Sequence, residues 1–316
     1  MWVLEDISKQ LEKLLREACD ACKASAIALS GGLDSTIIAH LLKKKEPEGI
    51  TIIAKDFVAN DLTYCQMVSK QFGIKSTICN VDTAEILDAV EQTIKILKNF
   101  NDIEIRNNVV MYLAIKWAKD NGKNDIITGD GADELFAGYN FLVNKSGEDL
   151  DREIERVCTI MHFPTKRIGN SLGVEVETPF LSENIVEFAK KIPSNLKVRR
   201  ENDTWYGKWV LRNTFKDKIP AQIAWRKKSP MQDGSGTAGL TRLFDAIIDD
   251  ESFKEKKDKI EDSDHVTIRT KESMFYYEKF RKHYNMPVNK TKNTCPFCKV
   301  DVNNSKFCRM CGAYPI

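Results

Sequence analysis

The sequence predicts an α/β protein: a parallel sheet flanked by helices, then a helical C-terminal extension and a small cysteine-rich tail. Short apolar runs alternate with helical patterns over the first 128 residues, which is typical of a parallel sheet covered on both faces. Two of these runs are followed directly by polar, glycine-rich segments, at Ser30 and at Gly129. Ligands of such sheets bind beyond the carboxyl ends of the strands, so we expect the functional site there.

The expected elements follow the hydrophobic pattern. A helix is predicted over residues 2–22, because Ile7, Leu11 and Leu15 belong to an apolar stripe at helical spacing. Residues 24–29 form a short apolar run and predict a buried strand. The alternation continues with helix 35–45, strand 50–55, helix 61–73, strand 75–81, helices 83–99 and 107–121, and strand 125–128. From 146 to 285 the pattern is helical and polar-rich, and prolines interrupt it.

These patterns predict four parts of the chain. They are an α/β core with its N-terminal helix (1–145), a helical part (146–285), a linker (286–294) and a tail module (295–316). The charge run at 254–262 is interpreted as a solvated helix face.

Composition excludes several broad classes. The 48 basic and 46 acidic residues give a net charge of +2, so no overall charge draws the chain to nucleic acid or membranes. The N-terminus carries acidic residues where a signal peptide needs positive charge, and no apolar run approaches the roughly 20 residues of a membrane span. We therefore expect a soluble, cytoplasmic protein without a membrane partner.

The segment SGGLDST (residues 30–36) has the composition of an anion-binding loop. It follows a predicted strand and opens a predicted helix, where backbone N–H groups and the helix dipole favour phosphate. No lysine of the Walker A pattern is present, and Asp34 instead places a carboxylate beside the anion, which requires a divalent cation between them. The residues expected to cradle phosphate are Ser30, Gly31, Gly32, Ser35 and Thr36.

A second motif, TGDGADELFAGY (residues 128–139), follows the strand at 125–128. Its acidic residues Asp130, Asp133 and Glu134 do not suit an apolar core, but their carboxylates are suitable ligands for a Mg²⁺ site that faces the first loop.

These motifs resemble a known family. SGGLDST resembles the pyrophosphate loop of the ATP pyrophosphatase superfamily, with its adenine nucleotide α-hydrolase-like fold. GDGADELFAGY resembles the signature of the C-terminal synthetase domain of asparagine synthetase B. Further matches in the same order are IRNNVVMYLA (105–114), VETPFLS (176–182), GKWVLRNTF and WRKKSPMQDGSG. The resemblance covers roughly residues 24–240.

The resemblance implies roles for particular residues. Asp34 and Asp133 would hold Mg²⁺ on the ATP phosphates, and Lys228 would neutralise phosphate charge as an acyl-adenylate forms. Asp130 would orient or deprotonate the incoming ammonia. Glu134 and Arg106 would lie near the substrate or hold the acidic loops of the site in place. Adenosine contacts are expected at Ala28, Ala54, Thr128 and Gly129. The implied reaction is the AMP- and pyrophosphate-forming synthesis of an amide, with aspartate as the expected carboxylate.

Some positions depart from the family pattern. Asp130 replaces a glutamate, Glu177 stands where an arginine is usual, and Ser182 replaces an aspartate. The N-terminal catalytic cysteine of a glutaminase is not seen, since Trp2 follows Met1, so free ammonia or a separate glutaminase is the expected nitrogen source.

The tail carries two CxxC pairs, at Cys295 and Cys298 and at Cys308 and Cys311, nine residues apart. This spacing predicts a closed, structural Zn²⁺ site in a zinc ribbon, with iron as the alternative metal. Ribbons of this kind often contact RNA or protein, whereas a short basic tail more often only keeps a module soluble. A further CxxC, Cys19 and Cys22, lies in the first helical pattern and is interpreted as core packing.

Two other functions fit parts of the sequence. Pyrophosphate loops joined to zinc ribbons also occur in tRNA-modifying thiolases, which adenylate a base. A nucleotide-binding regulator without activity would require a decayed site, yet Asp34, Asp133 and Lys228 are all present.

Overall fold

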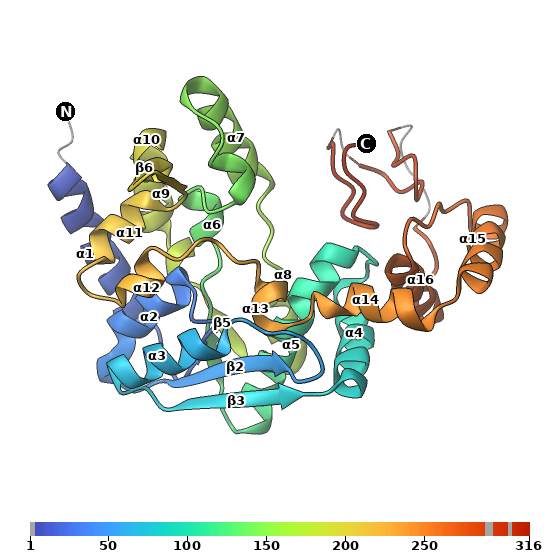
Figure 1. The fold of residues 1–316 in the computed structure, drawn as a ribbon, viewed down its shortest axis with the longest axis horizontal. Helices are drawn as coiled ribbons and strands as arrows, with labels where there is room; N and C mark the ends of the chain where they lie inside the picture. The colour runs from blue at the N-terminus through green and yellow to red at the C-terminus, as the bar shows by residue number, and fades with distance from the viewer. Residues whose placement is uncertain (1–3, 288–292, 303–304) are drawn as a thin grey trace. The chain divides into compact units, whose positions relative to one another are not determined.

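The structure is a computed structural model that describes residues 4–287, 293–302 and 305–316 (Figure 1). The expected linker, 286–294, therefore lies mostly outside the described residues. The chain divides into two compact units, each assembled from three stretches of sequence. The first comprises Met1–Ile53, Asn60–Cys79 and Ala114–Pro230, and the second comprises Ala54–Ala59, Asn80–Leu113 and Met231–Ile316.

A five-stranded sheet has the order β3-β2-β1-β4-β5. Its strands are β1 (Ala26–Ala28), β2 (Glu48–Ala54), β3 (Ser76–Val81), β4 (Asp125–Ile127) and β5 (Glu175–Glu177). β1 runs parallel to both β2 and β4, with Ile27 opposite Ile127, and β4 runs parallel to β5. The expected parallel sheet flanked by helices is confirmed.

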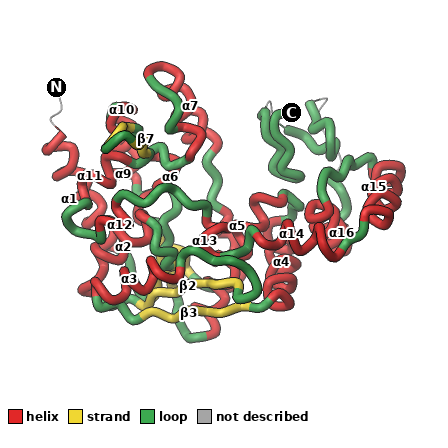
Figure 2. Tube along the Cα trace, in the orientation of Figure 1, coloured by secondary structure: helices red, strands yellow, loops and turns green. Residues whose placement is uncertain are grey.

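The helical expectation for residues 146–285 missed two features. β5 adds an edge strand to the sheet, and β6 (Arg199–Glu201) pairs with β7 (Thr204–Tyr206) in an antiparallel hairpin separate from it (Figure 2). Each of these strands has three residues, and the sequence of β5 is Glu-Val-Glu. Strands of three residues are too short to carry an alternation that a sequence pattern could reveal.

Helices of the first unit enclose an apolar core. Ile7, Leu11 and Leu15 of α1 are fully buried, and α1 packs against α2, α9 and α11. The described helices of this unit are α1 (Leu4–Ala21), α2 (Leu33–Leu42), η1 (Lys43–Lys45), α3 (Leu62–Phe72), α6 (Ala132–Leu135), η2 (Asn140–Leu142), α7 (Gly147–Ile160), α8 (Pro164–Leu172), η3 (Pro179–Leu181), α9 (Glu183–Lys191), α10 (Ser194–Lys197), α11 (Trp209–Phe215) and α12 (Ala221–Ala224). Cys19 is buried in this core and Cys22 is half-buried, as expected for packing residues.

The second unit is helical. Its helices are α4 (Thr83–Leu97), the first part of α5 (Asp102–Asp120), α13 (Met231–Ser235), α14 (Gly239–Ile247), α15 (Asp250–Asp264) and α16 (Lys271–His283). α16 packs against α4 and α14, and its aromatic residues Tyr276 and Phe280 are buried. α15 buries none of its residues, which confirms that the charge run at 254–262 lies on a solvated helix.

None of the helices in the described part of the chain combines the length and the apolar character that crossing a membrane requires.

Candidate active site

The strand order brings the two predicted motifs to one edge of the sheet. The chain leaves β1 toward β2 and β3, then returns to place β4 on the other side of β1. Because β1 and β4 are parallel, the loops that follow them leave the sheet side by side at its carboxyl edge. This reversal of strand order is where sheets of this kind bind ligands.

The first loop is tightly folded against the start of α3. Gly31 has a φ of +63°, and a Cβ atom there would lie 2.5 Å from Cβ of Tyr64, so only glycine fits. The N–H of Gly32 donates to Oγ of Ser30 over 3.3 Å, and the hydroxyls of Ser30 and Ser35 are 3.1 Å apart. Gly32 then caps α2, whose free N–H groups point toward the loop.

Two polar atoms of this loop are buried and lack a hydrogen-bond partner among the described residues: Oδ1 of Asp34 and Oγ1 of Thr36. A buried oxygen without a partner costs free energy unless a ligand satisfies it. Both atoms therefore mark this loop as a place where a ligand completes the structure.

The second loop lies directly against the first. A Cβ atom at Gly129 would come within 2.9 Å of Cβ of Asp34, so the close approach of the two loops requires glycine. Gly131 has a φ of +93° and turns the chain into the short helix α6, which carries Asp133 and Glu134.

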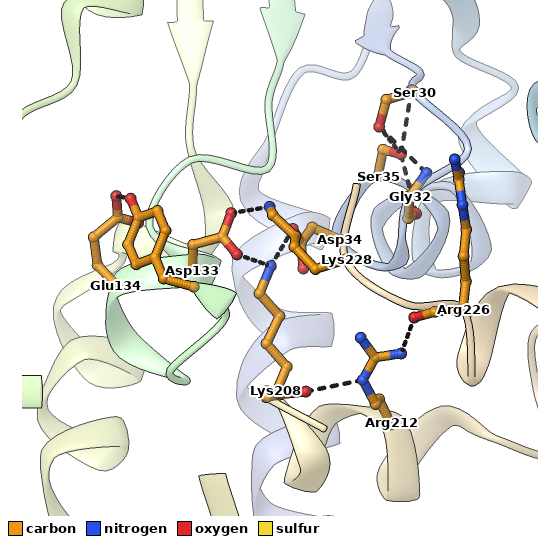
Figure 3. Close-up of polar contacts among 12 residues, drawn as sticks. Ser30, Gly32, Asp34, Ser35, Asp133, Glu134, Lys208, Arg212, Arg226 and Lys228 are labelled. Atoms are coloured by element: carbon orange, nitrogen blue, oxygen red, sulfur yellow. Dashed lines mark hydrogen bonds and ion pairs between the residues drawn. The ribbon is translucent and has the colours of Figure 1, made fainter. Parts of the chain in front are cut away.

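Four charged side chains meet between these loops (Figure 3). Nζ of Lys208 lies 2.6 Å from Oδ2 of Asp34 and 2.7 Å from Oδ1 of Asp133. Nζ of Lys228 lies 2.6 Å from Oδ2 of Asp133. Burial alone would raise the pKa of the Asp133 carboxyl, but the two lysines outweigh it and hold that pKa well below its usual range.

Asp130 and Glu134 have neutral hydrogen-bond donors. The hydroxyl of Thr165, at the start of α8, donates to Oδ2 of Asp130, and the hydroxyl of Tyr139 donates to Oε1 of Glu134 over 2.6 Å. Burial raises the pKa of both carboxyls, although these hydrogen bonds act in the opposite direction. Asp130 is thus placed beside Asp133 with the raised pKa that suits a general base.

Sequence reasoning missed three basic residues of this region. Lys208 bridges the carboxylates of Asp34 and Asp133. The guanidinium of Arg212 donates to the carbonyls of Ala224 and Arg226 over 2.6 and 3.0 Å, which fixes the segment before Lys228. Arg226 stacks over the ring of Tyr64 and pairs with Asp61 at 3.2 Å. The signal was present, because these residues belong to the GKWVLR and WRKK stretches that were noted only as resemblances.

The carboxylates fit a divalent cation. Mg²⁺ prefers one or two carboxylates together with substrate phosphates, and Oδ1 of Asp34 is a buried oxygen with no other partner among the described residues. Asp34 would hold the ion at this edge of the sheet, and Asp133 is the adjacent second carboxylate.

The other predicted site residues are placed as follows. Ala28 ends β1, and Thr128 follows β4 as a buried residue whose N–H donates to the carbonyl of Glu177. Ala54 and Arg106 belong to the second unit, so their roles toward a nucleotide or substrate stay predictions. The Arg106 guanidinium there lies 3.3 Å from Glu272 and donates to Thr241 over 2.8 Å.

The two substituted positions of the VETPFLS segment have structural surroundings. The Glu177 carboxylate accepts hydrogen bonds from the backbone N–H groups of Lys23 and Ala24, the former at 2.9 Å. Ser182 is the N-cap residue of α9, directly before the first helical residue.

One known protein family matches nearly the whole chain. The model of the family described as Asparagine synthase matches residues 6–155 and 157–296. The chain belongs to the asparagine synthase family.

Curated relatives of this asparagine synthase family member are longer proteins. The glutamine-hydrolysing asparagine synthetase of Gallus gallus is 27% identical over 302 residues, which cover 89% of this chain and 53% of the chicken protein. Asparagine synthetase B of Escherichia coli is 26% identical over 280 residues, which cover 83% of this chain and 50% of that protein. The chain thus spans about half the length of the curated relatives it matches.

Among solved structures, NMN synthetase from Francisella tularensis is 12% identical and covers 92% of this chain and 100% of its own, with a TM-score of 0.32. A likeness this low adds nothing to the description of the fold.

A cysteine cluster lies almost entirely beyond the family match, which ends at residue 296. Cys295, Cys298, Cys308 and Cys311 are buried, and their sulfurs lie within 4.8 Å of one another. The Sγ atoms of Cys295 and Cys311 are 3.7 Å apart, and those of Cys298 and Cys308 are 3.5 Å apart. Zn–S bonds of about 2.3 Å place the sulfurs of a tetrahedron at about these separations, so the cluster fits Zn²⁺.

The tail is not a free appendage of the second unit. The N–H of Thr267 donates to the carbonyl of Phe297 over 2.7 Å, and the N–H of Phe100 donates to the carbonyl of Met310 over 2.9 Å. The Arg269 guanidinium donates to the carbonyl of Cys311 over 2.8 Å. The cysteine turns are therefore bound to the segment between α4 and α5 and to the segment before α16.

Proposed function

We propose that the protein is an AMP-forming amide synthetase that activates a carboxylate with ATP and transfers it to ammonia. Aspartate is the proposed carboxylate and asparagine the proposed product. Membership of the asparagine synthase family supports ATP-dependent formation of a C–N bond. The observation that carries the proposal is the cluster of Asp34, Asp133, Lys208 and Lys228, in which four separate motifs meet at the edge of the sheet.

The chain's own groups suit this reaction. The loop around Gly31 and Gly32 and the start of α2 would bind pyrophosphate as a carboxylate oxygen attacks the α-phosphorus of ATP. A bound Mg²⁺ would neutralise charge on the phosphates. Lys228 would stabilise the charge that develops on the transferred group, since a preorganised cation in a buried site is effective there.

The second half-reaction forms the amide. Ammonia attacks the acyl carbon of the adenylate, and AMP leaves with the bonding electrons. Asp130 would accept a proton from the attacking nitrogen, because it is a half-buried carboxyl with a raised pKa that Thr165 holds in place.

The test is release of AMP and pyrophosphate from MgATP by the purified protein. Aspartate is added or omitted, and ammonium, glutamine, or glutamine with an added glutaminase supplies nitrogen. We expect aspartate-dependent AMP and asparagine with ammonium, and at least about a hundredfold loss in Asp34→Asn. Asp217→Asn removes an exposed carboxylate of the same unit and should leave the rate unchanged.

Release of AMP without any dependence on aspartate would remove aspartate as the substrate. A parallel reaction with bulk tRNA in place of aspartate covers adenylation of a base. AMP that appears only with tRNA would overturn amide synthesis and favour an RNA-modifying enzyme with a ribbon that binds RNA.

A further inference from the structure

Lys208 occupies the place between the two carboxylates that the family resemblance assigns to a metal. Its side chain is only 4% exposed, and its Nζ lies within 2.7 Å of an oxygen of Asp34 and of Asp133. A lysine amine held between two carboxylates is an ammonium cation at neutral pH.

Glycines on two segments make room for this lysine. A Cβ atom at Gly138 would lie 2.2 Å from Cε of Lys208 and 1.9 Å from Oδ1 of Asp133. A Cβ atom at Gly207 would lie 2.2 Å from the carbonyl oxygen of Ala137. Neither contact is sterically possible, so the close approach of these segments requires glycine at both positions.

Backbone hydrogen bonds fix the lysine from both sides. Its own N–H donates to the carbonyl of Phe136 over 2.9 Å, and the buried Arg212 holds the carbonyl of Gly207 over 2.9 Å. Lys208 also has a φ of +54°, a conformation that costs free energy for a residue with a side chain. The position of its ammonium group is therefore built into the fold.

The charges of the cluster cancel. Asp34 and Asp133 contribute two negative charges, and Lys208 and Lys228 contribute two positive charges, which sum to zero. A neutral cluster attracts a free divalent cation weakly, and the cation must compete with Lys208 for the same oxygens. A triphosphate adds several negative charges, gives both lysines new partners and leaves the carboxylates free for a metal.

We propose that Lys208 is a positioning residue that holds Asp34 and Asp133 together and keeps a divalent cation from binding until a nucleotide arrives. The cation then enters with the nucleotide rather than before it. This inference rests on the proposed function for the identity of the nucleotide, but its central comparison needs neither nucleotide nor turnover.

The experiment measures binding of free Mn²⁺ by electron paramagnetic resonance, with and without an ATP analogue that has a methylene group between its α- and β-phosphates. The wild-type protein should bind Mn²⁺ weakly alone and strongly with the analogue. Lys208→Met should bind Mn²⁺ alone at least about tenfold more tightly, because one positive charge beside the carboxylates is removed. Lys208→Arg keeps the charge and should stay weak, and Lys227→Met removes an exposed charge nearby and should match the wild type.

Unchanged Mn²⁺ affinity in Lys208→Met without nucleotide would overturn the proposal. If the analogue fails to strengthen Mn²⁺ binding to the wild type, the proposed ATP-dependent function is wrong. The Mn²⁺ affinities of the wild type and Lys208→Met without nucleotide still test whether Lys208 keeps the cation out.

A measurement on the wild type covers the case in which Lys208→Met does not fold. In protein labelled with ¹⁵N-lysine, the buried ammonium of Lys208 should give a protected resonance, identified by its loss in Lys208→Arg. Mg²⁺ with the analogue should shift this resonance, and Mg²⁺ alone should not. A shift with Mg²⁺ alone would contradict the proposal.

Discussion

Nζ of Lys228 lies 2.6 Å from Oδ2 of Asp133, which joins two motifs that are 95 residues apart in the sequence. The pair connects the loop after β4 to the segment after α12, and Arg212 holds that segment through the carbonyls of Ala224 and Arg226. Lys228 is thus aimed at the same edge of the sheet as the phosphate loop, so its cation is available to a phosphoryl group there.

Replacing Lys228 by methionine tests this placement. Lys228→Met should lower kcat for AMP formation by about a hundred- to a thousandfold, which is typical for loss of one preorganised charge that stabilises a transition state. The protein should remain folded, because Asp133 keeps its contact with Lys208. Steady-state kinetics with MgATP, beside circular dichroism, check both statements. Lys227→Met is the matched control, and a fall of less than threefold in Lys228→Met would exclude a catalytic role for this lysine.

The hydrogen bond from Thr165 to Asp130 leads to a prediction about pH. The bond favours the ionised carboxylate and so lowers a pKa that burial has raised. Thr165→Val removes the donor and keeps the shape, so the pKa of Asp130 should rise further. If Asp130 acts as a base it must be ionised, and the acidic limb of the profile of kcat/KM against pH should move to higher pH.

The profile is measured for wild type, Thr165→Val and the control Thr159→Val, which alters an exposed threonine of α7. A limb that stays in place or moves to lower pH in Thr165→Val would argue that Asp130 does not carry the proton.

The phosphate loop could be predicted from the sequence because its determinants are local. SGGLDST sits between a short apolar strand and a helix, and the structure places it at the end of β1 with Gly31 in a conformation that needs glycine. The GDGADE motif likewise follows β4, and the parallel pairing of β1 with β4 brings the two loops together. The position of a motif that directly follows a strand can thus be predicted from the sequence around it.

Lys208 belongs to the GKWVLR stretch, but its local sequence does not predict its place in the site. By local pattern a lysine at the start of a helix is a solvated residue. Its burial here depends on Gly138 and on the carbonyl of Phe136, about 70 positions earlier in the sequence. The edge strand β5 was missed because three residues, two of them glutamates, show no strand pattern and gain their partner only from β4. Contacts between distant segments decide both cases.

Removal of the metal from the cysteine cluster should loosen the second unit beyond the tail itself. The N–H groups of Phe100 and Thr267 donate to carbonyls of Met310 and Phe297, which the metal site orders. Because binding of a structural metal contributes directly to folding, chelation should lower Tm by roughly 5 °C or more. Hydrogen exchange should show loss of protection at Phe100 and Thr267.

Metal content checks the same prediction. The wild type and the control Cys79→Ser should retain one zinc ion per chain, and Cys298→Ser should lose it. Full protection of Phe100 and Thr267 after the metal is stripped would mean that the tail docks without its metal.

The buried Lys197 leads to the prediction that its replacement by methionine stabilises the protein in a pH-dependent way. Lys197 ends α10, which packs against α7. The residue is only 4% exposed, and this burial lowers its pKa to about 8. Between pH 8 and its unfolded value near 10.5 the unfolded chain binds more protons at this residue, so its contribution to stability rises with pH. Below pH 8 the charged, buried ammonium costs up to about 3 kcal/mol, since one pKa unit corresponds to about 1.4 kcal/mol.

Lys197→Met should therefore raise the free energy of unfolding by about 1–3 kcal/mol at pH 7, and the gain should shrink toward zero as pH approaches 10.5. Urea unfolding at pH 7 and at pH 10 measures both values, with the exposed Lys191→Met as a control that should change stability by less than about 0.5 kcal/mol. A Lys197→Met protein that is less stable than wild type at pH 7 would show instead that the ammonium group stabilises the packing of α10 on α7.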